Sequence, residues 1–89
     1  MTFSTSPDVL AAHLAGEAVL LNLEDKSYYR LNETAALIWS ALEKGETHDA
    51  ILAQLLATYD GEETQVLREL DLVIEEFKMR KLVVENPDG

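Results

Sequence analysis

The fold is decided around residues 27–39, which read SYYRLNETAALIW. The first five residues are rich in aromatic side chains and predict a strand, because aromatic residues suit a pleated surface. Asn32 follows, and its side-chain oxygen can accept from backbone amides that the first turn of a helix leaves unpaired. Apolar residues then recur at helical spacing, at Ala35, Ile38, Trp39 and Leu42. The stretch therefore predicts a strand that leads directly into a helix.

A β-hairpin is expected upstream of this helix. Residues 18–23 form a short apolar run, and the polar residues 24–26 separate it from the strand at residues 27–31. Residues 9–14 are predicted as a further strand, although their alanines also fit a turn of helix. The N-terminal third of the chain is thus expected to be mainly strand.

Two neighbouring tyrosines mark the second strand of the hairpin. Side chains alternate along a strand, so Tyr29 and Leu31 are predicted to share one face. Tyr28 and Arg30 then lie on the opposite face, and only one of the tyrosines can point into a core. The other is either a surface residue with good strand propensity or an exposed aromatic group in a binding groove.

A second helix is predicted after the first, which ends near residues 44–45. Thr47 can cap it, and apolar residues at helical spacing continue it to Tyr59. Residues 60–61, an Asp-Gly pair, break it.

A third helix is expected over residues 62–81. Leu72 and Met79 lie about a quarter turn off its main apolar stripe, at about 100° per residue, so its apolar face is wider than one contact surface requires. A short closing strand is expected at residues 82–84, and residues 85–89 are expected to fray.

Strands followed by three helices with short linkers predict an α+β fold in which the helices cover one face of a small antiparallel sheet. A winged helix-turn-helix is one such arrangement. The length of 89 residues suits one compact core, so residues 1–89 are expected to form a single domain. Cysteine is absent, which fits a cytoplasmic protein, and neither a signal peptide nor a membrane span is predicted.

The chain is strongly acidic. Seven Lys and Arg stand against seventeen Asp and Glu, for a formal net charge of −10. A field of this sign repels phosphate backbones, so nucleic acid is not an expected partner. The charge serves either solubility alone or the attraction of a basic peptide.

Groups that could perform catalysis do not converge in this sequence. His13 and His48 are isolated in different elements and lack the spacing of metal ligands, so neither a metal nor a cofactor is expected. Adjacent carboxylates on a strand or helix point in different directions and do not make an acid/base pair. We therefore expect a protein that is not an enzyme.

Residues 19–39 resemble a known family pattern. The run VLLNL at residues 19–23, followed by YYRLNETAALIW at residues 28–39, is similar to "vLLd…yy.LNeTa..iW" of the PqqD-like proteins. The resemblance extends from residue 9 to residue 84. It implies a winged helix-turn-helix with an N-terminal three-stranded antiparallel sheet followed by three helices. It also implies a recognition element for the leader segment of a ribosomally made precursor peptide.

The resemblance implies a site as well. In the family, the leader adds as an antiparallel strand to the edge of the third strand and lies against the third helix. Of the residues on that helix, we expect Leu70 to lie partly in the core beneath the others. The peptide-binding residues expected here are Ser27, Tyr28, Tyr29, Arg30, Leu31, Leu67, Leu70, Asp71 and Ile74.

The sequence differs from PqqD itself, which carries a Tyr-Pro-Glu-like segment where this chain has residues 22–24 and an Asp-Gly where it has residues 44–45. The chain looks more like a stand-alone leader-binding protein of lasso-peptide biosynthesis. Its expected partners are a precursor leader peptide and a leader peptidase or other modifying enzyme. The alternatives are a PqqD-type peptide chaperone for a radical enzyme and, less favoured, a winged-helix nucleic-acid binder.

Overall fold

The computed structural model describes residues 2–86, which form an α+β fold. In chain order the elements within these residues are β1 (Thr2–Thr5), β2 (Val9–Leu14), β3 (Glu17–Asn22), β4 (Ser27–Leu31), α1 (Glu33–Glu43), α2 (His48–Thr58), α3 (Glu63–Met79) and β5 (Val83–Asn86). The predicted order of an antiparallel sheet followed by three helices is confirmed, and residues 9–14 are a strand.

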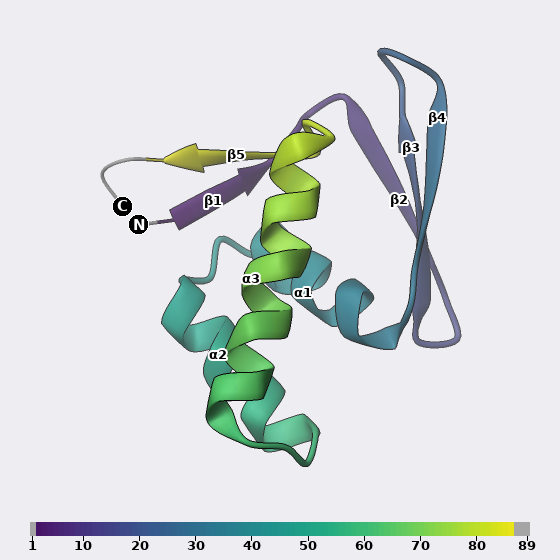
Figure 1. The fold of residues 1–89 in the computed structure, drawn as a ribbon. Helices are drawn as coiled ribbons and strands as arrows, with labels where there is room; N and C mark the ends of the chain where they lie inside the picture. The colour runs from purple at the N-terminus through teal and green to yellow at the C-terminus, as the bar shows by residue number, and fades with distance from the viewer. Residues whose placement is uncertain (1, 87–89) are drawn as a thin grey trace.

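The described strands form two antiparallel sheets. One has the order β2-β3-β4, and the other pairs β1 with β5. In Figure 1 the β1–β5 pair and the three-stranded sheet lie on opposite sides of the helices. Helix α1 contacts strands of both sheets and both other helices, so it lies at the centre of the fold.

Side-chain caps begin two of the helices, as the sequence predicts. The Asn32 Oδ1 accepts from the backbone N–H of Ala35 at 2.9 Å, and the Thr47 Oγ1 accepts from that of Ala50 at 3.2 Å. These bonds satisfy amides that a helix start otherwise leaves unpaired. The Asn32 cap also fixes where β4 ends, because α1 begins one residue later.

A two-residue turn joins β2 to β3. Ala15 and Gly16 both have positive φ, 48° and 86°, and they lie between the paired residues Leu14 and Glu17. Two positive φ values are typical of the type I′ turn, whose twist matches that of the flanking strands. This turn sets the register of β2 against β3.

The core gathers around a single tryptophan. Trp39 of α1 meets Phe77 of α3 edge to face, with ring centroids 5.5 Å apart. The other large side chains that are almost fully buried come from β3, from all three helices and from the residue before β5. They are Leu20, Ile38, Leu42, Ile51, Leu55, Leu70 and Leu82.

Three features toward the chain ends differ from what the sequence predicts. Strand β1 was not predicted, and residues 85–86 were expected to fray but belong to β5. Helix α3 ends at Met79, two residues before the expected end. β1 escapes prediction because its partner strand lies at the other end of the chain, so no local pattern signals the pairing. Residues 87–89 lie outside the described residues.

Candidate functional site

Strand β4 is an edge strand. It pairs with β3 on one side, and no other described strand pairs with it. The Leu23 N–H donates to the Asp8 carbonyl at 2.8 Å, in line with the β2–β3 register. Hydrogen-bonded pairs alternate along an antiparallel ladder, so odd-numbered residues of β3 bond to β2 and even-numbered ones to β4. The N–H and C=O groups of Tyr28 and Arg30 therefore turn toward the free edge.

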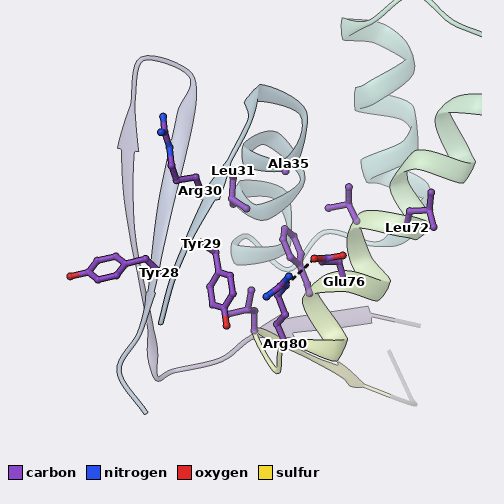
Figure 2. A pocket seen from close by; sticks show the side chains of 11 residues that line it. Tyr28, Tyr29, Arg30, Leu31, Ala35, Leu72, Glu76 and Arg80 are labelled. Atoms are coloured by element: carbon purple, nitrogen blue, oxygen red, sulfur yellow. Dashed lines mark hydrogen bonds and ion pairs between the residues drawn. The ribbon is translucent and has the colours of Figure 1, made fainter. Parts of the chain in front are cut away.

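A groove lies between this edge and α3. Its volume is about 560 Å³, within the range of small-molecule sites. Figure 2 shows the side chains that line it. We call it the β4–α3 groove, lined by Tyr28, Tyr29, Arg30, Leu31, Ala35, Leu72, Val73, Glu76, Phe77, Arg80 and Leu82.

The alternation predicted for β4 is confirmed. Tyr29 is half-buried and Leu31 is buried, whereas Tyr28 is 71% exposed and Arg30 is exposed. Figure 2 shows Tyr28 directed away from α3 and Tyr29 on the side of Arg80. The inner face of β4 therefore contributes an aromatic ring and an apolar side chain to the groove.

Arg80 reaches across the groove. Its guanidinium carbon lies 4.9 Å from the centroid of the Tyr29 ring, and its Nε donates to the Glu76 Oε1 at 2.9 Å. The hydrogen bond to Glu76, and after it one involving Tyr29, raises the pKa of Arg80 above its usual value. The guanidinium thus links β4 to α3 while it stays charged.

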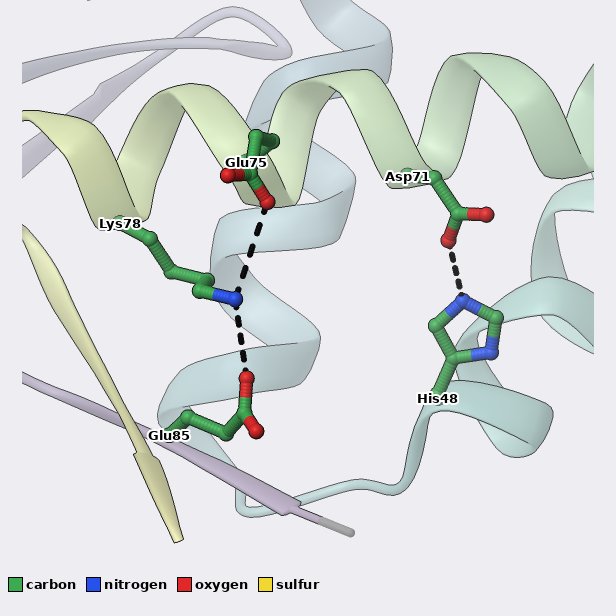
Figure 3. Close-up of polar contacts among 5 residues, drawn as sticks. All are labelled: His48, Asp71, Glu75, Lys78 and Glu85. Carbon is green, nitrogen blue, oxygen red and sulfur yellow. Dashed lines mark hydrogen bonds and ion pairs between the residues drawn. The ribbon is translucent and has the colours of Figure 1, made fainter.

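Four α3 residues were expected at the peptide site, Leu67, Leu70, Asp71 and Ile74. Leu70 is fully buried and Ile74 is only 4% exposed, so both belong to the core and the expectation that Ile74 faces outward was wrong. Leu67 and Asp71 line a different, shallower hollow of α3. The Asp71 Oδ1 accepts from the His48 Nε2 of α2 at 2.7 Å (Figure 3). None of the four lines the β4–α3 groove.

The α3 residues that do line the groove lie one turn apart. Leu72 and Glu76 are spaced by four, as are Val73 and Phe77, and such residues stack on one side of a helix; Arg80, the C-cap, follows Glu76 at the same spacing. Leu72 is 64% exposed, in agreement with its position off the main apolar stripe. That displaced leucine was the signal in the sequence for this second face.

Side chains of the metal-binding types do not gather in one place within the described residues. No group of three or more His, Cys, Asp or Glu side chains among residues 2–86 could hold a metal ion. His13 lies 3.7 Å from Glu43, and His48 pairs with Asp71, so the two histidines are in separate places. No helix within the described part of the chain is long and apolar enough to cross a membrane.

Comparisons with known proteins find relatives that share this fold. The model of the family described as coenzyme PQQ synthesis protein D (PqqD) matches residues 17–83. A solved structure described as TbiB1 in complex with the TbiA(beta) leader peptide is similar, with a TM-score of 0.88 and 29% identity over 96% of this chain and 99% of that one. Another, a lasso peptide synthetase B1 complexed with the leader peptide, has a TM-score of 0.84 and 26% identity over 93% and 98%. No curated protein matches.

Proposed function

The chain belongs to the PqqD family, and we propose that it binds the leader segment of a ribosomally made precursor peptide as an added strand on β4. The observation that carries this proposal is the free edge of β4 beside the β4–α3 groove. An edge strand offers unpaired N–H and C=O groups to a guest backbone, while an adjoining groove selects its side chains.

The two similar structures support the same function. Both are described as complexes with a leader peptide, and both match nearly the full length of this chain. Because one is a lasso peptide synthetase B1, we propose lasso-peptide biosynthesis as the setting. A precursor made on the ribosome is met in the cytoplasm, which is where we expect this protein to act.

The groove is needed for affinity. Four or five strand hydrogen bonds contribute about 0.5–1.5 kcal/mol each, whereas micromolar binding requires about 8 kcal/mol. Each apolar guest side chain that becomes buried adds roughly 1.5–3 kcal/mol before ordering costs are subtracted. Leu31, Val73 and Phe77 provide apolar walls for such anchors. Backbone pairing and two or three anchors together reach the micromolar range before ordering costs are subtracted.

We further propose that the protein does not modify the peptide itself and presents it to a separate leader peptidase or other modifying enzyme. Holding the substrate raises its effective concentration near that enzyme. Incubation of the purified protein with the peptide should leave the peptide mass unchanged. A cleaved or altered mass would contradict the proposed division of labour.

Nucleic-acid binding is disfavoured by the surroundings of the basic residues on and after α3. Lys78 lies 2.9 Å from Glu85 and 3.7 Å from Glu75 (Figure 3), and Arg80 pairs with Glu76. These partners occupy charges that phosphates would need. A gel-shift assay at low salt should therefore detect no complex with duplex DNA.

The proposed function is tested first by selecting peptides from a phage-displayed library of random 16-residue sequences. Amide exchange is then measured by NMR on the protein with and without an enriched peptide. We expect new protection at the Tyr28 and Arg30 amides, which face the free edge, and little change in α2. Protection confined to α2, with β4 unchanged, would place the guest on the helix-turn-helix face and contradict strand addition.

A further inference from the structure

The β4–α3 groove holds a pair of opposite charges on the side of α3. The charged groups there are the Arg80 guanidinium and the Glu76 carboxylate, because Arg30, the third charged residue of the lining, belongs to the outer face of β4. The chain as a whole has a formal net charge of −10. A guanidinium beside a groove in so acidic a protein is a candidate contact for a negatively charged ligand group.

Arg80 is the guanidinium that faces a guest side chain. Arg30 is an outer-face residue of β4, with its side chain 83% exposed and 3.6 Å from Glu17. Arg80 instead lies over the ring of Tyr29, on the inner face of β4, and its Nε is held by Glu76. A planar guanidinium carries five N–H donors, so donors beyond the one on Nε exist to bind a second, planar carboxylate.

We propose that Arg80 is a specificity-determining residue that binds a carboxylate side chain of the guest peptide, with Glu76 as its partner in the empty groove. This inference rests on the proposed function. A guest residue paired opposite Tyr29 points to the same face as Tyr29 and therefore toward Arg80. The preferred guest has an Asp or Glu at that position.

The strand repeat also fixes where the guest's apolar anchor lies. Tyr29 and Leu31 are two residues apart on one face of β4, so the guest residues opposite them are two apart as well. The residue opposite Leu31 meets the apolar part of the groove, formed with Val73 and Phe77. The expected guest pattern is an acidic and an apolar residue separated by a single residue.

Selection from a phage-displayed library of random 12-residue peptides tests this pattern on three proteins. These are the wild type, Arg80→Gln, and the matched control Lys78→Gln. Lys78→Gln removes the same charge from a side chain held by Glu85 outside the groove. Wild type and Lys78→Gln should enrich peptides that carry both the acidic residue and the apolar anchor. Arg80→Gln should enrich peptides that carry the apolar anchor without the acidic residue.

Synthetic versions of an enriched peptide then measure the effect. Replacing its acidic residue by the amide should weaken binding to the wild type about tenfold or more, since charge-assisted bidentate pairs are among the stronger hydrogen bonds. The same replacement should change binding to Arg80→Gln less than twofold, and Arg80→Lys should fall between. Glu76→Gln should strengthen binding of the acidic peptide severalfold, because it removes the internal competitor, while Glu75→Gln should not.

The outcomes separate this inference from the proposed function. If the wild type enriches peptides that lack an acid beside the anchor, or if Arg80→Gln selects the same acid-containing pattern, the role of Arg80 is wrong and peptide binding stands. If no peptide is enriched on the wild type, both proposals are wrong. Thermal melts of each variant check that it folds, and unchanged melts are expected because the Arg80 side chain is 47% exposed.

Discussion

At the scale of single residues, one buried polar side chain holds the turn that presents β4. Asn22 is only 5% exposed, and its Oδ1 accepts from the Glu24 N–H at 2.9 Å. Its own carbonyl accepts from the Lys26 N–H at 2.7 Å. A buried polar group that loses its partner costs more than an exposed one, because water cannot replace the bond.

Asn22→Ala should therefore lower the free energy of unfolding by about 1–2 kcal/mol. Asp25→Ala is the matched comparison, since the Asp25 Oδ1 accepts from the Ser27 N–H at 2.9 Å in the same turn but at an exposed position. Asp25→Ala should lower the free energy of unfolding by about 0.5 kcal/mol or less. Urea unfolding of both variants provides the measurement, and equal losses would contradict a role for burial.

A strained residue follows Arg80, the C-cap of α3. Lys81 has φ of 59°, a left-handed conformation that costs a residue with a side chain roughly 1–2 kcal/mol and costs glycine almost nothing. The next residue, Leu82, donates its N–H to the Phe77 carbonyl at 2.8 Å and turns its side chain into the groove lining. The turn at Lys81 thus helps to shape the groove.

Lys81→Gly should raise the melting temperature. The free energy of unfolding should increase by about 0.5–1 kcal/mol after the added conformational entropy of the unfolded chain is subtracted. Lys81→Ala removes the same charge and keeps the strain, so it should give no such gain. A lower melting temperature for the glycine variant would mean that the lysine side chain contributes more than the backbone costs.

At the scale of elements, the free edge of β4 consists of the backbone N–H and C=O groups of Tyr28 and Arg30. Proline at Arg30 removes an N–H that faces the edge and leaves the β3–β4 bonds intact. Arg30→Pro should thus abolish binding of a library-selected peptide at a small cost in stability. Arg30→Ala keeps the N–H and should retain most of the binding, as measured by fluorescence anisotropy of the labelled peptide.

Proline at Tyr29 has the opposite signature. The Tyr29 N–H points toward β3, so its loss breaks the ladder and should lower stability markedly. If Tyr29→Pro folds as well as Arg30→Pro, the alternation inferred for β4 is wrong by one residue.

The elements themselves were largely predictable from the sequence, because their signals are local. Alternation along β4 and the caps at Asn32 and Thr47 each lie within a few neighbouring residues. The helical wall of the site was not predictable in the same way. Apolar spacing cannot tell which apolar residues of α3 face the core, so Ile74 was placed at the surface and Arg80 was missed. The packing of α3 against α1, α2 and β5 decides that rotation.

At the scale of the whole molecule, the net charge of −10 acts over distances longer than the groove. Long-range attraction mainly affects encounter, and salt screens it within about 10 Å at 0.1 M. For a selected peptide with net positive charge, stopped-flow mixing should show association slowing as salt rises while dissociation changes less. Association rates independent of salt would mean that the acidic surface serves solubility alone.

The pairing of β1 with β5 has a mechanical consequence. The register of Thr2 with Asn86 brings the first and last described residues side by side, away from β4 (Figure 1). Tension applied through these two residues loads the cross-strand hydrogen bonds of the pair one after another, so the two strands separate sequentially from this end. A pull on the two ends would separate β1 from β5 before the force reached Leu82. The strand proposed to bind a guest would therefore keep its shape under a load that has already begun to unfold the opposite side.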